Sequence, residues 1–297
     1  MAHIPALPEG STLALVAPAG ASSPERIEQV PRLLESMGWR CKLMPGVSGG
    51  STLDFLSADD DVRLTDLHAA FADPQVDAVY TLRGGYGCAR LLDRIDTSLL
   101  RAHPKPLIGY SDITTLHALR DALGQPGWHA PMPASDLLTE GGARDIHALR
   151  EALQGGTRSG QVIAPAMQAH ALNRGVSARG RLVGGNLAVY AALLGTPWQP
   201  RIEDSILYLE DVGEAPYRVD RMLTQLRLAG LLDDAAGFLV GSFTDEDYPQ
   251  AVLADLLHAT GKPVLAGWPS GHCSPHTPLP LGVEVEMDVA GRRLTLR

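Results

Sequence analysis

The 297-residue chain is long enough for one or two domains, and its 45% hydrophobic and 20% charged content is typical of a soluble globular protein rather than a disordered one. The net charge of −9 argues against nucleic acid or an anionic membrane as a partner, because neither attracts an acidic surface. No segment approaches the roughly 20 apolar residues of a membrane span, and the N-terminus lacks the basic start of a signal peptide. The three cysteines are far apart and odd in number. We therefore expect a cytoplasmic protein without a disulfide framework.

The first half alternates short apolar runs with helical patterns. We expect strands at 12–17, 41–44, 76–82 and 106–110, and helical stretches after residue 23, after residue 57, at 89–95 and at 112–123. Ser23 followed by Pro24 is typical of a helix start, and Ser57 is predicted to cap the next helix. Strands that alternate with helices predict a mostly parallel sheet, on which ligands bind where strands end and helices begin.

The composition changes between about residues 153 and 179, where Gly, Ser and Pro replace the helical period. We therefore place an N-terminal domain at 1–155, a linker at 156–178 and a C-terminal domain at 179–297. The second half predicts strands at 175–183, 206–209, 237–243 and 263–266, a helix at 216–229, and a hairpin over 283–296.

The strongest local signal for chemistry is the run PLIGYSDITT at 106–115. An apolar strand ends, Ser111 follows at the turn, and a helix begins. The backbone N–H groups that open this helix, starting with that of Asp112, are free to bind an oxyanion. These are the features of a nucleophile elbow, although the G-x-S-x-G form is absent. The alternative is that Ser111 only caps the helix.

A second signal is the run RGGYG at 83–87, directly after the strand expected at 76–82. Clustered glycines let the backbone approach a ligand closely. A phosphate-binding loop is one interpretation, but no P-loop lysine follows and G-x-G-x-x-G is absent. The other two interpretations of this loop are a site for an oxyanion or a carboxylate, and a plain strand–helix turn.

Acidic residues follow the strand expected at 206–209. Glu210 comes first, where an inward carboxylate could orient a histidine; Asp211 and Glu214 follow. The alternative is that these acids only favour the N-terminus of the helix at 216–229. Paired carboxylates could also indicate a glycosidase, but the chain lacks an aromatic-rich sugar cleft.

A histidine that could complete such a site is His272, in a Gly/Pro-rich loop after the strand at 263–266. His276 and His129 are its nearest rivals. Cys273 could hint at a thiol nucleophile, but no helix start supports it. Neither CxxC nor HExxH occurs, so we expect no metal site. Serine, glutamate and histidine suffice for acyl transfer: histidine takes the serine proton and returns it to the leaving amine, and glutamate holds the imidazole tautomer.

Taken in order, these segments resemble the serine LD-carboxypeptidase family, which includes muramoyl-tetrapeptide carboxypeptidase and the microcin-C immunity peptidases. The resemblance covers essentially the whole chain. It rests on VAPAG at 16–20, RGGYG at 83–87, GYSDIT at 109–114, GGNL at 184–187, LEDVGEAPYR at 209–218, GH at 271–272 and LPLG at 279–282.

The resemblance implies an α/β fold with an N-terminal parallel-sheet domain that carries a nucleophile elbow, and a smaller mixed α/β C-terminal domain. It implies a serine peptidase whose catalytic triad is Ser111, Glu210 and His272. The oxyanion hole would be the backbone N–H groups of Asp112 and of a glycine in the 84–85 pair, taken as Gly85.

The implied reaction releases terminal D-alanine from a murein tetrapeptide, at the bond after a dibasic L-centre, in cytoplasmic wall recycling. A homodimer without metal or organic cofactor is expected, with a small peptide as substrate and neither nucleic acid nor membrane as partner. Arg83 and Tyr86 are candidates to bind the terminal carboxylate, because a guanidinium pairs bidentately with it.

Three alternatives stay open. The first is an immunity peptidase that cleaves a peptidyl-nucleotide antibiotic, although the possible base-stacking aromatics are scattered tryptophans. The second is a non-catalytic peptide-binding protein, which predicts that the three triad side chains do not converge. The third is a nucleotide-binding enzyme, which lacks both the lysine and the acidic ribose partner of known fingerprints.

Overall fold

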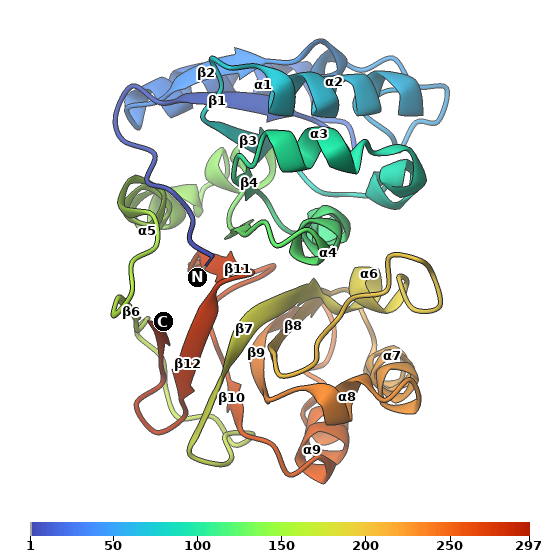
Figure 1. The fold of residues 1–297 in the computed structure, drawn as a ribbon, viewed down its shortest axis with the longest axis vertical. Coiled ribbons are helices and arrows are strands. Elements are labelled where there is room, and N and C mark those ends of the chain that lie inside the picture. Colours follow the sequence, from blue (N-terminus) through green and yellow to red (C-terminus); the bar gives the residue numbers. More distant parts are fainter. Residues whose placement is uncertain (1) are drawn as a thin grey trace.

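The computed structural model describes residues 2–297, which form two β-sheets flanked by helices (Figure 1). The first sheet has the strand order β11-β5-β4-β3-β1-β2. Its strands are β1 (Thr12–Val16), β2 (Arg40–Leu43), β3 (Ala78–Thr81), β4 (Leu107–Ile108), β5 (Gly127–His129) and β11 (Leu279–Leu281). Strands β1 to β5 run parallel to one another.

Five helices accompany this sheet: α1 (Pro24–Ser36), α2 (Asp60–Ala72), α3 (Thr97–Ala102), α4 (Thr114–Ala122) and α5 (Gly142–Gly155). As predicted, Ser23 caps α1, with its Oγ accepting a hydrogen bond from the Arg26 N–H at 3.4 Å. The predicted cap for α2 is wrong. Asp59 precedes that helix, and the Ser57 hydroxyl instead donates to the Ala17 carbonyl, which holds the loop before α2 onto the end of β1.

Short non-α turns lie at four loops of the first half. Three are 3₁₀ turns and the fourth is a π turn: η1 (Pro45–Ser48), η2 (Cys88–Arg94), η3 (Ser111–Ile113) and the π turn η4 (Pro133–Leu137). The helical stretch expected at 89–95 is therefore a 3₁₀ turn. The helix expected at 112–123 is η3 continued by α4.

The second sheet has the strand order β10-β9-β8-β7-β12-β13-β6. Its strands are β6 (Val162–Ile163), β7 (Ser177–Asn186), β8 (Ile206–Val212), β9 (Gly237–Thr244), β10 (Val264–Ala266), β12 (Glu284–Asp288) and β13 (Arg293–Leu296). Strands β7 to β10 are parallel, and β12 and β13 form the antiparallel hairpin expected at the end of the chain. The two mixed sheets confirm the predicted α/β class.

The helices beside this sheet are α6 (Leu187–Ala191), α7 (Pro216–Leu228), α8 (Leu231–Asp234) and α9 (Gln250–Ala259). The apolar side of α7 is buried through Val219, Leu223 and Leu226. Within residues 2–297, every helix is too short or too polar to cross a lipid bilayer.

The C-terminal half contributes a strand to the first sheet, which the sequence did not predict. Strand β11 comes from near the C-terminus and pairs antiparallel with β5, Leu279 lying opposite His129. The first sheet is therefore mostly parallel, as predicted, with one antiparallel edge strand. Strand β6 lies in the stretch expected to be a linker and pairs with β13. The missed strands are β5, β6 and β11, each of two or three residues.

Helix α4 lies between the sheets, where it packs against β7 and α6 (Figure 1). Strands β3 and β4 of the first sheet lead, at their C-terminal ends, into the RGGYG loop and into Ser111. Because these strands are parallel, both loops emerge at one edge of the sheet, which faces the second half of the chain.

Candidate active site

Ser111 stands in the turn between β4 and α4, with a backbone φ of 64°. This left-handed conformation is uncommon for a residue with a side chain and is a form of strain that occurs at functional sites. The cap positions are taken by Tyr110 before η3 and Ile113 before α4, so the alternative that Ser111 is only an N-cap is wrong. Gly109 allows the sharp approach: its φ is 151°, and a Cβ there would lie 2.1 Å from the Thr81 hydroxyl.

Three side chains from separate segments converge at this turn. The Oγ of Ser111 lies 3.2 Å from Nε2 of His272. The other ring nitrogen of His272, Nδ1, lies 2.7 Å from Oε2 of Glu210. Ser111 belongs to the first sheet, whereas Glu210 is on β8 and His272 follows β10, so the arrangement exists only where the two halves meet. The two distances contradict the alternative of a non-catalytic binding protein, which predicted that the three side chains do not converge.

Glu210 lies on β8, a strand that is buried along nearly its whole length. The register of β8 against β9 shifts between Leu209 and Asp211. Glu210 and Asp211 are both buried. Glu210 also accepts the backbone N–H of His272 at 3.1 Å, and Asp211 accepts the Asn186 side-chain amide at 2.8 Å.

The charges around the imidazole favour its protonated form. Burial alone lowers the pKa of His272, but the Glu210 carboxylate and its hydrogen bond, with smaller contributions from Asp136 and Asp211, raise that pKa above its usual 6.5. Burial raises the pKa of Asp211 to about 6. The imidazole is therefore placed to accept a proton from Ser111 and to be stabilised as a cation.

The RGGYG loop lies against Ser111. A Cβ on Gly84 would meet the Ser111 Cβ at 2.7 Å and its Oγ at 2.8 Å, so only glycine fits there. The Gly84 carbonyl accepts the Gly20 N–H at 3.0 Å. In a planar trans peptide, the N–H of Gly85 then points away from Gly20. Asp112 is buried, and its carboxylate accepts the Cys88 N–H at 2.8 Å.

The two predicted substrate-binding side chains lie on the same loop but outside the triad. An Nη1 of Arg83 donates to the Ala21 carbonyl at 3.0 Å, and its buried Nε has no partner among residues 2–297. Tyr86 is 52% exposed and packs against the exposed Phe55, with ring centroids 5.8 Å apart. Neither Arg83 nor Tyr86 lines the cavity beside His272.

The other candidates for the acid, the histidine and the nucleophile do not take part in the triad contacts. Glu214 forms an ion pair with Arg218 at 3.7 Å and not with the histidine. His276 and His129 face each other with 3.3 Å between ring nitrogens, and burial lowers the pKa of His276 to about 3. Burial raises the pKa of Cys273 to about 11, which keeps the thiol protonated.

Several polar residues near the triad were not predicted from the sequence to have a role in the site. Tyr110 packs its ring on that of His272, and its hydroxyl donates to Asp136. The Thr114 hydroxyl accepts the buried N–H of Asn186 at 3.0 Å, which ties α4 to β7. A buried polar side chain needs partners, but Asp136 and Asn186 are distant in sequence from the residues they serve, so no local pattern marks them.

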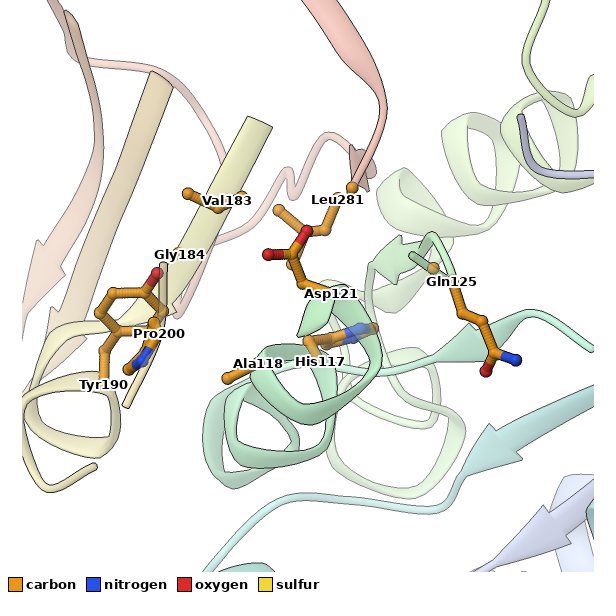
Figure 2. A pocket seen from close by; sticks show the side chains of 11 residues that line it. His117, Ala118, Asp121, Gln125, Val183, Gly184, Tyr190, Pro200 and Leu281 are labelled. Carbon is orange, nitrogen blue, oxygen red and sulfur yellow. The ribbon is translucent and has the colours of Figure 1, made fainter. Parts of the chain in front are cut away.

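Two cavities flank this region. One of about 260 Å³ opens beside His272, lined also by Tyr110, Asp136, Asp245 and Cys273. The other, between α4, β7 and β11, holds only about 10 Å³, near the volume of one water molecule (Figure 2). Only the first has room for part of a peptide. Among residues 2–297, no group of three or more His, Cys, Asp or Glu side chains is arranged to hold a metal ion.

Comparison with known proteins places this geometry in a family. The family model of the LD-carboxypeptidase N-terminal domain matches residues 13–130, and that of the LD-carboxypeptidase C-terminal domain matches residues 179–287. A probable murein peptide carboxypeptidase of Bacillus subtilis is 37% identical over 296 residues, covering 96% of this chain and 91% of the relative.

Solved structures agree on the fold. The muramoyltetrapeptide carboxypeptidase of Oxalobacter formigenes superposes with a TM-score of 0.84 at 29% identity, covering 96% of this chain and 98% of that one. The microcin C7 self-immunity protein MccF, in complex with aspartyl sulfamoyl adenosine, has a TM-score of 0.87 at 19% identity, covering 100% and 98%. The predicted resemblance is confirmed: the chain belongs to the LD-carboxypeptidase family and is a serine-type LD-carboxypeptidase.

Proposed function

We propose that this protein hydrolyses the L,D-amide bond that releases terminal D-alanine from a murein tetrapeptide, with Ser111, His272 and Glu210 as its catalytic triad. The observation that carries the proposal is the continuous chain of contacts from the Ser111 Oγ through both ring nitrogens of His272 to Glu210, at 3.2 and 2.7 Å. The relatives named as murein peptide and muramoyltetrapeptide carboxypeptidases support the substrate.

The proposed reaction has two steps. The Ser111 Oγ attacks the carbonyl carbon of the scissile amide, and its proton passes to Nε2 of His272. The imidazolium then gives that proton to the departing amine of D-alanine, which leaves an acyl-enzyme. Water enters, loses a proton to His272 and attacks the ester carbonyl; Ser111 regains a proton as the shortened peptide departs. Throughout, Glu210 holds Nδ1 and stabilises the ring cation.

The negative oxygen formed in each step needs donors. We propose the backbone N–H groups of Asp112, at the start of the helical segment, and of Gly85. The direction of the Gly84–Gly85 peptide supports the second donor, because its carbonyl is engaged by Gly20. We also propose that Arg83 binds the terminal carboxylate, since its buried Nε is unpartnered, with Tyr86 beside it at the solvent edge.

The test is the release of D-alanine from L-Ala–γ-D-Glu–meso-diaminopimelate–D-Ala, comparing the native protein with Ser111→Ala. We expect release by the native protein and loss of at least about 10³-fold in the variant. Release that survives the substitution would keep the activity but remove Ser111 from the mechanism. No release by folded native protein would contradict the proposed substrate.

A second candidate is hydrolysis of a peptidyl-nucleotide antibiotic. The observation that favours it is the exposed Phe55–Tyr86 pair beside the RGGYG loop, which offers aromatic faces to a nucleobase. The likeness to MccF adds only the shared fold. Incubation with aspartyl sulfamoyl adenosine distinguishes the two: cleavage of its acyl–nitrogen bond with no D-alanine release from the tetrapeptide would favour the second candidate.

The family resemblance also leads us to propose a homodimer that works in cytoplasmic wall recycling. Light scattering of the purified protein checks the first statement, since a dimer has twice the 31.6 kDa of the chain. Fractionation of cells that produce the protein, with a cytoplasmic marker enzyme as control, checks the second.

A further inference from the structure

A further carboxylate, half-buried, lies close to the proposed triad. Asp136 sits in the π turn Pro133–Leu137, after β5, and its side chain lines the same cavity as His272. Its two oxygens accept three hydrogen bonds, from the Tyr110 hydroxyl at 2.8 Å, the Met132 N–H at 2.6 Å and the Ser135 hydroxyl at 3.0 Å. Burial raises the pKa of Asp136, while the three donors hold its carboxylate in one orientation and offset part of that rise.

Tyr110 connects this carboxylate to both reacting side chains. It directly precedes Ser111 and has extended backbone, with φ of −150° and ψ of −166°, before the chain turns into the left-handed conformation of the serine. Its ring packs on the His272 ring with centroids 4.9 Å apart. The Tyr110 ring also contacts the His276 ring edge-on, with centroids 4.8 Å apart, and the His129 ring at a tilt, with centroids 5.3 Å apart. Rotation of the tyrosine ring would therefore disturb the imidazole.

We propose that Asp136 is a positioning residue of this site: it fixes Tyr110, and through that ring the nucleophile turn and the imidazole, and its negative charge stabilises the imidazolium formed during acyl transfer. The inference rests on the proposed triad mechanism and gives Glu210 and Asp136 different tasks in the site. Glu210 selects the tautomer by direct contact, whereas Asp136 acts through Tyr110 and across the cavity.

The electrostatic half of the proposal has a definite sign. The titratable groups around the His272 ring are Glu210, Asp211, Asp136, Tyr110, His129, Cys273 and His276, and Asp145 and Asp245 line the same cavity. Burial keeps the two neighbouring histidines neutral and the Cys273 thiol protonated, so the nearby carboxylates, Asp136 among them, are the groups that raise the pKa of His272. Removing the Asp136 charge must then lower the pKa of His272.

Two variants separate position from charge. Asp136→Asn removes the charge; its one amide oxygen can still accept the Tyr110 hydroxyl, but the amide nitrogen that replaces Oδ2 no longer accepts the Met132 N–H. Tyr110→Phe removes that hydroxyl but leaves the carboxylate. Asp66→Asn is the matched control, because the Asp66 carboxylate likewise accepts a backbone N–H, that of Gly46, but it is not among the groups facing His272.

The first measurement is an NMR titration of the His272 ring in a Ser111→Ala background, with the signal assigned by its loss in His272→Gln. We expect Asp136→Asn to move the titration to lower pH, and Tyr110→Phe and Asp66→Asn to leave it in place. An unmoved titration in folded Asp136→Asn overturns the electrostatic half. This readout needs no substrate, so it stands even if the tetrapeptide is not hydrolysed.

The second measurement is kcat/KM for D-alanine release against pH. We expect Tyr110→Phe to lower the plateau about ten- to hundredfold without moving the acid limb, because small displacements of reacting groups have effects of that size. Asp136→Asn should move the limb to lower pH as the NMR titration does. If Asp136→Asn does not fold, Tyr110→Phe still decides the positioning half, since activity within threefold of native overturns it.

Discussion

The side chain of Ser111, the proposed nucleophile, lies directly against Gly84. Gly84→Ala adds only one methyl group, but it should lower activity strongly. The new Cβ would lie 2.7 Å from the Ser111 Cβ and 2.8 Å from its Oγ, whereas ordinary contacts begin at 3.4 Å. The atoms must therefore separate by about 0.7 Å. The loop cannot retreat freely, because the Gly84 carbonyl is bonded to the Gly20 N–H.

The displaced group is therefore Ser111. A shift of this size at a reacting atom lowers kcat/KM by about 10²-fold. The overpacking should also lower the free energy of unfolding by about 1–3 kcal/mol. Backbone strain does not contribute, since no positive φ occurs at Gly84. The expected signature is a large loss of activity with a modest loss of stability.

The assay measures kcat/KM for D-alanine release and the rate of labelling by a fluorophosphonate, which reports an activated serine without using the peptide. Gly155→Ala is the control. Gly155 ends α5, has nothing within 4 Å of its added Cβ and has no positive φ. It should keep native activity and gain up to about 1 kcal/mol in stability. Native activity and labelling in folded Gly84→Ala would refute the contact argument.

Three further outcomes are expected. Glu210→Gln should lower kcat/KM by about 10⁴-fold with a similar melting temperature, because a glutamine can hold the His272 ring in the wrong tautomer; a loss below tenfold would contradict this. Because the pKa of His272 is raised and its neutral form is the base, kcat/KM should fall on acidification with a midpoint above pH 6.5, and a midpoint below 6.5 would contradict the assignment. Thr114→Val removes the acceptor of the buried Asn186 N–H and should lower the unfolding free energy by about 1–3 kcal/mol in urea denaturation, whereas a change under about 0.5 kcal/mol would show that this link is unimportant.

The apolar runs of the sequence predicted the parallel strands β1 to β4 because each run is bounded by turn residues or by a helical period. The same reasoning failed for β5, β6 and β11; β4 is as short as they are, so length alone is not the cause. Strands β11 and β6 pair with β5 and β13, which are far away in the sequence. Such strands exist because neighbouring strands offer unpaired backbone groups, and that is a property of the assembled sheet. Ser57 shows the same limit: its hydroxyl bonds the distant Ala17 carbonyl rather than the start of α2.

The sequence by itself determined the family and the fold class, and it indicated three candidate side chains with the right chemistry, since the local patterns around them are readable. Only the tertiary structure decided that Ser111 and His272, 161 residues apart, lie within 3.2 Å. The Glu210–His272 and Asp136–Tyr110 contacts also appear only there. The physical reason is that burial and long-range hydrogen bonds depend on which surfaces meet when the two sheets pack together, and no local run of residues encodes that meeting.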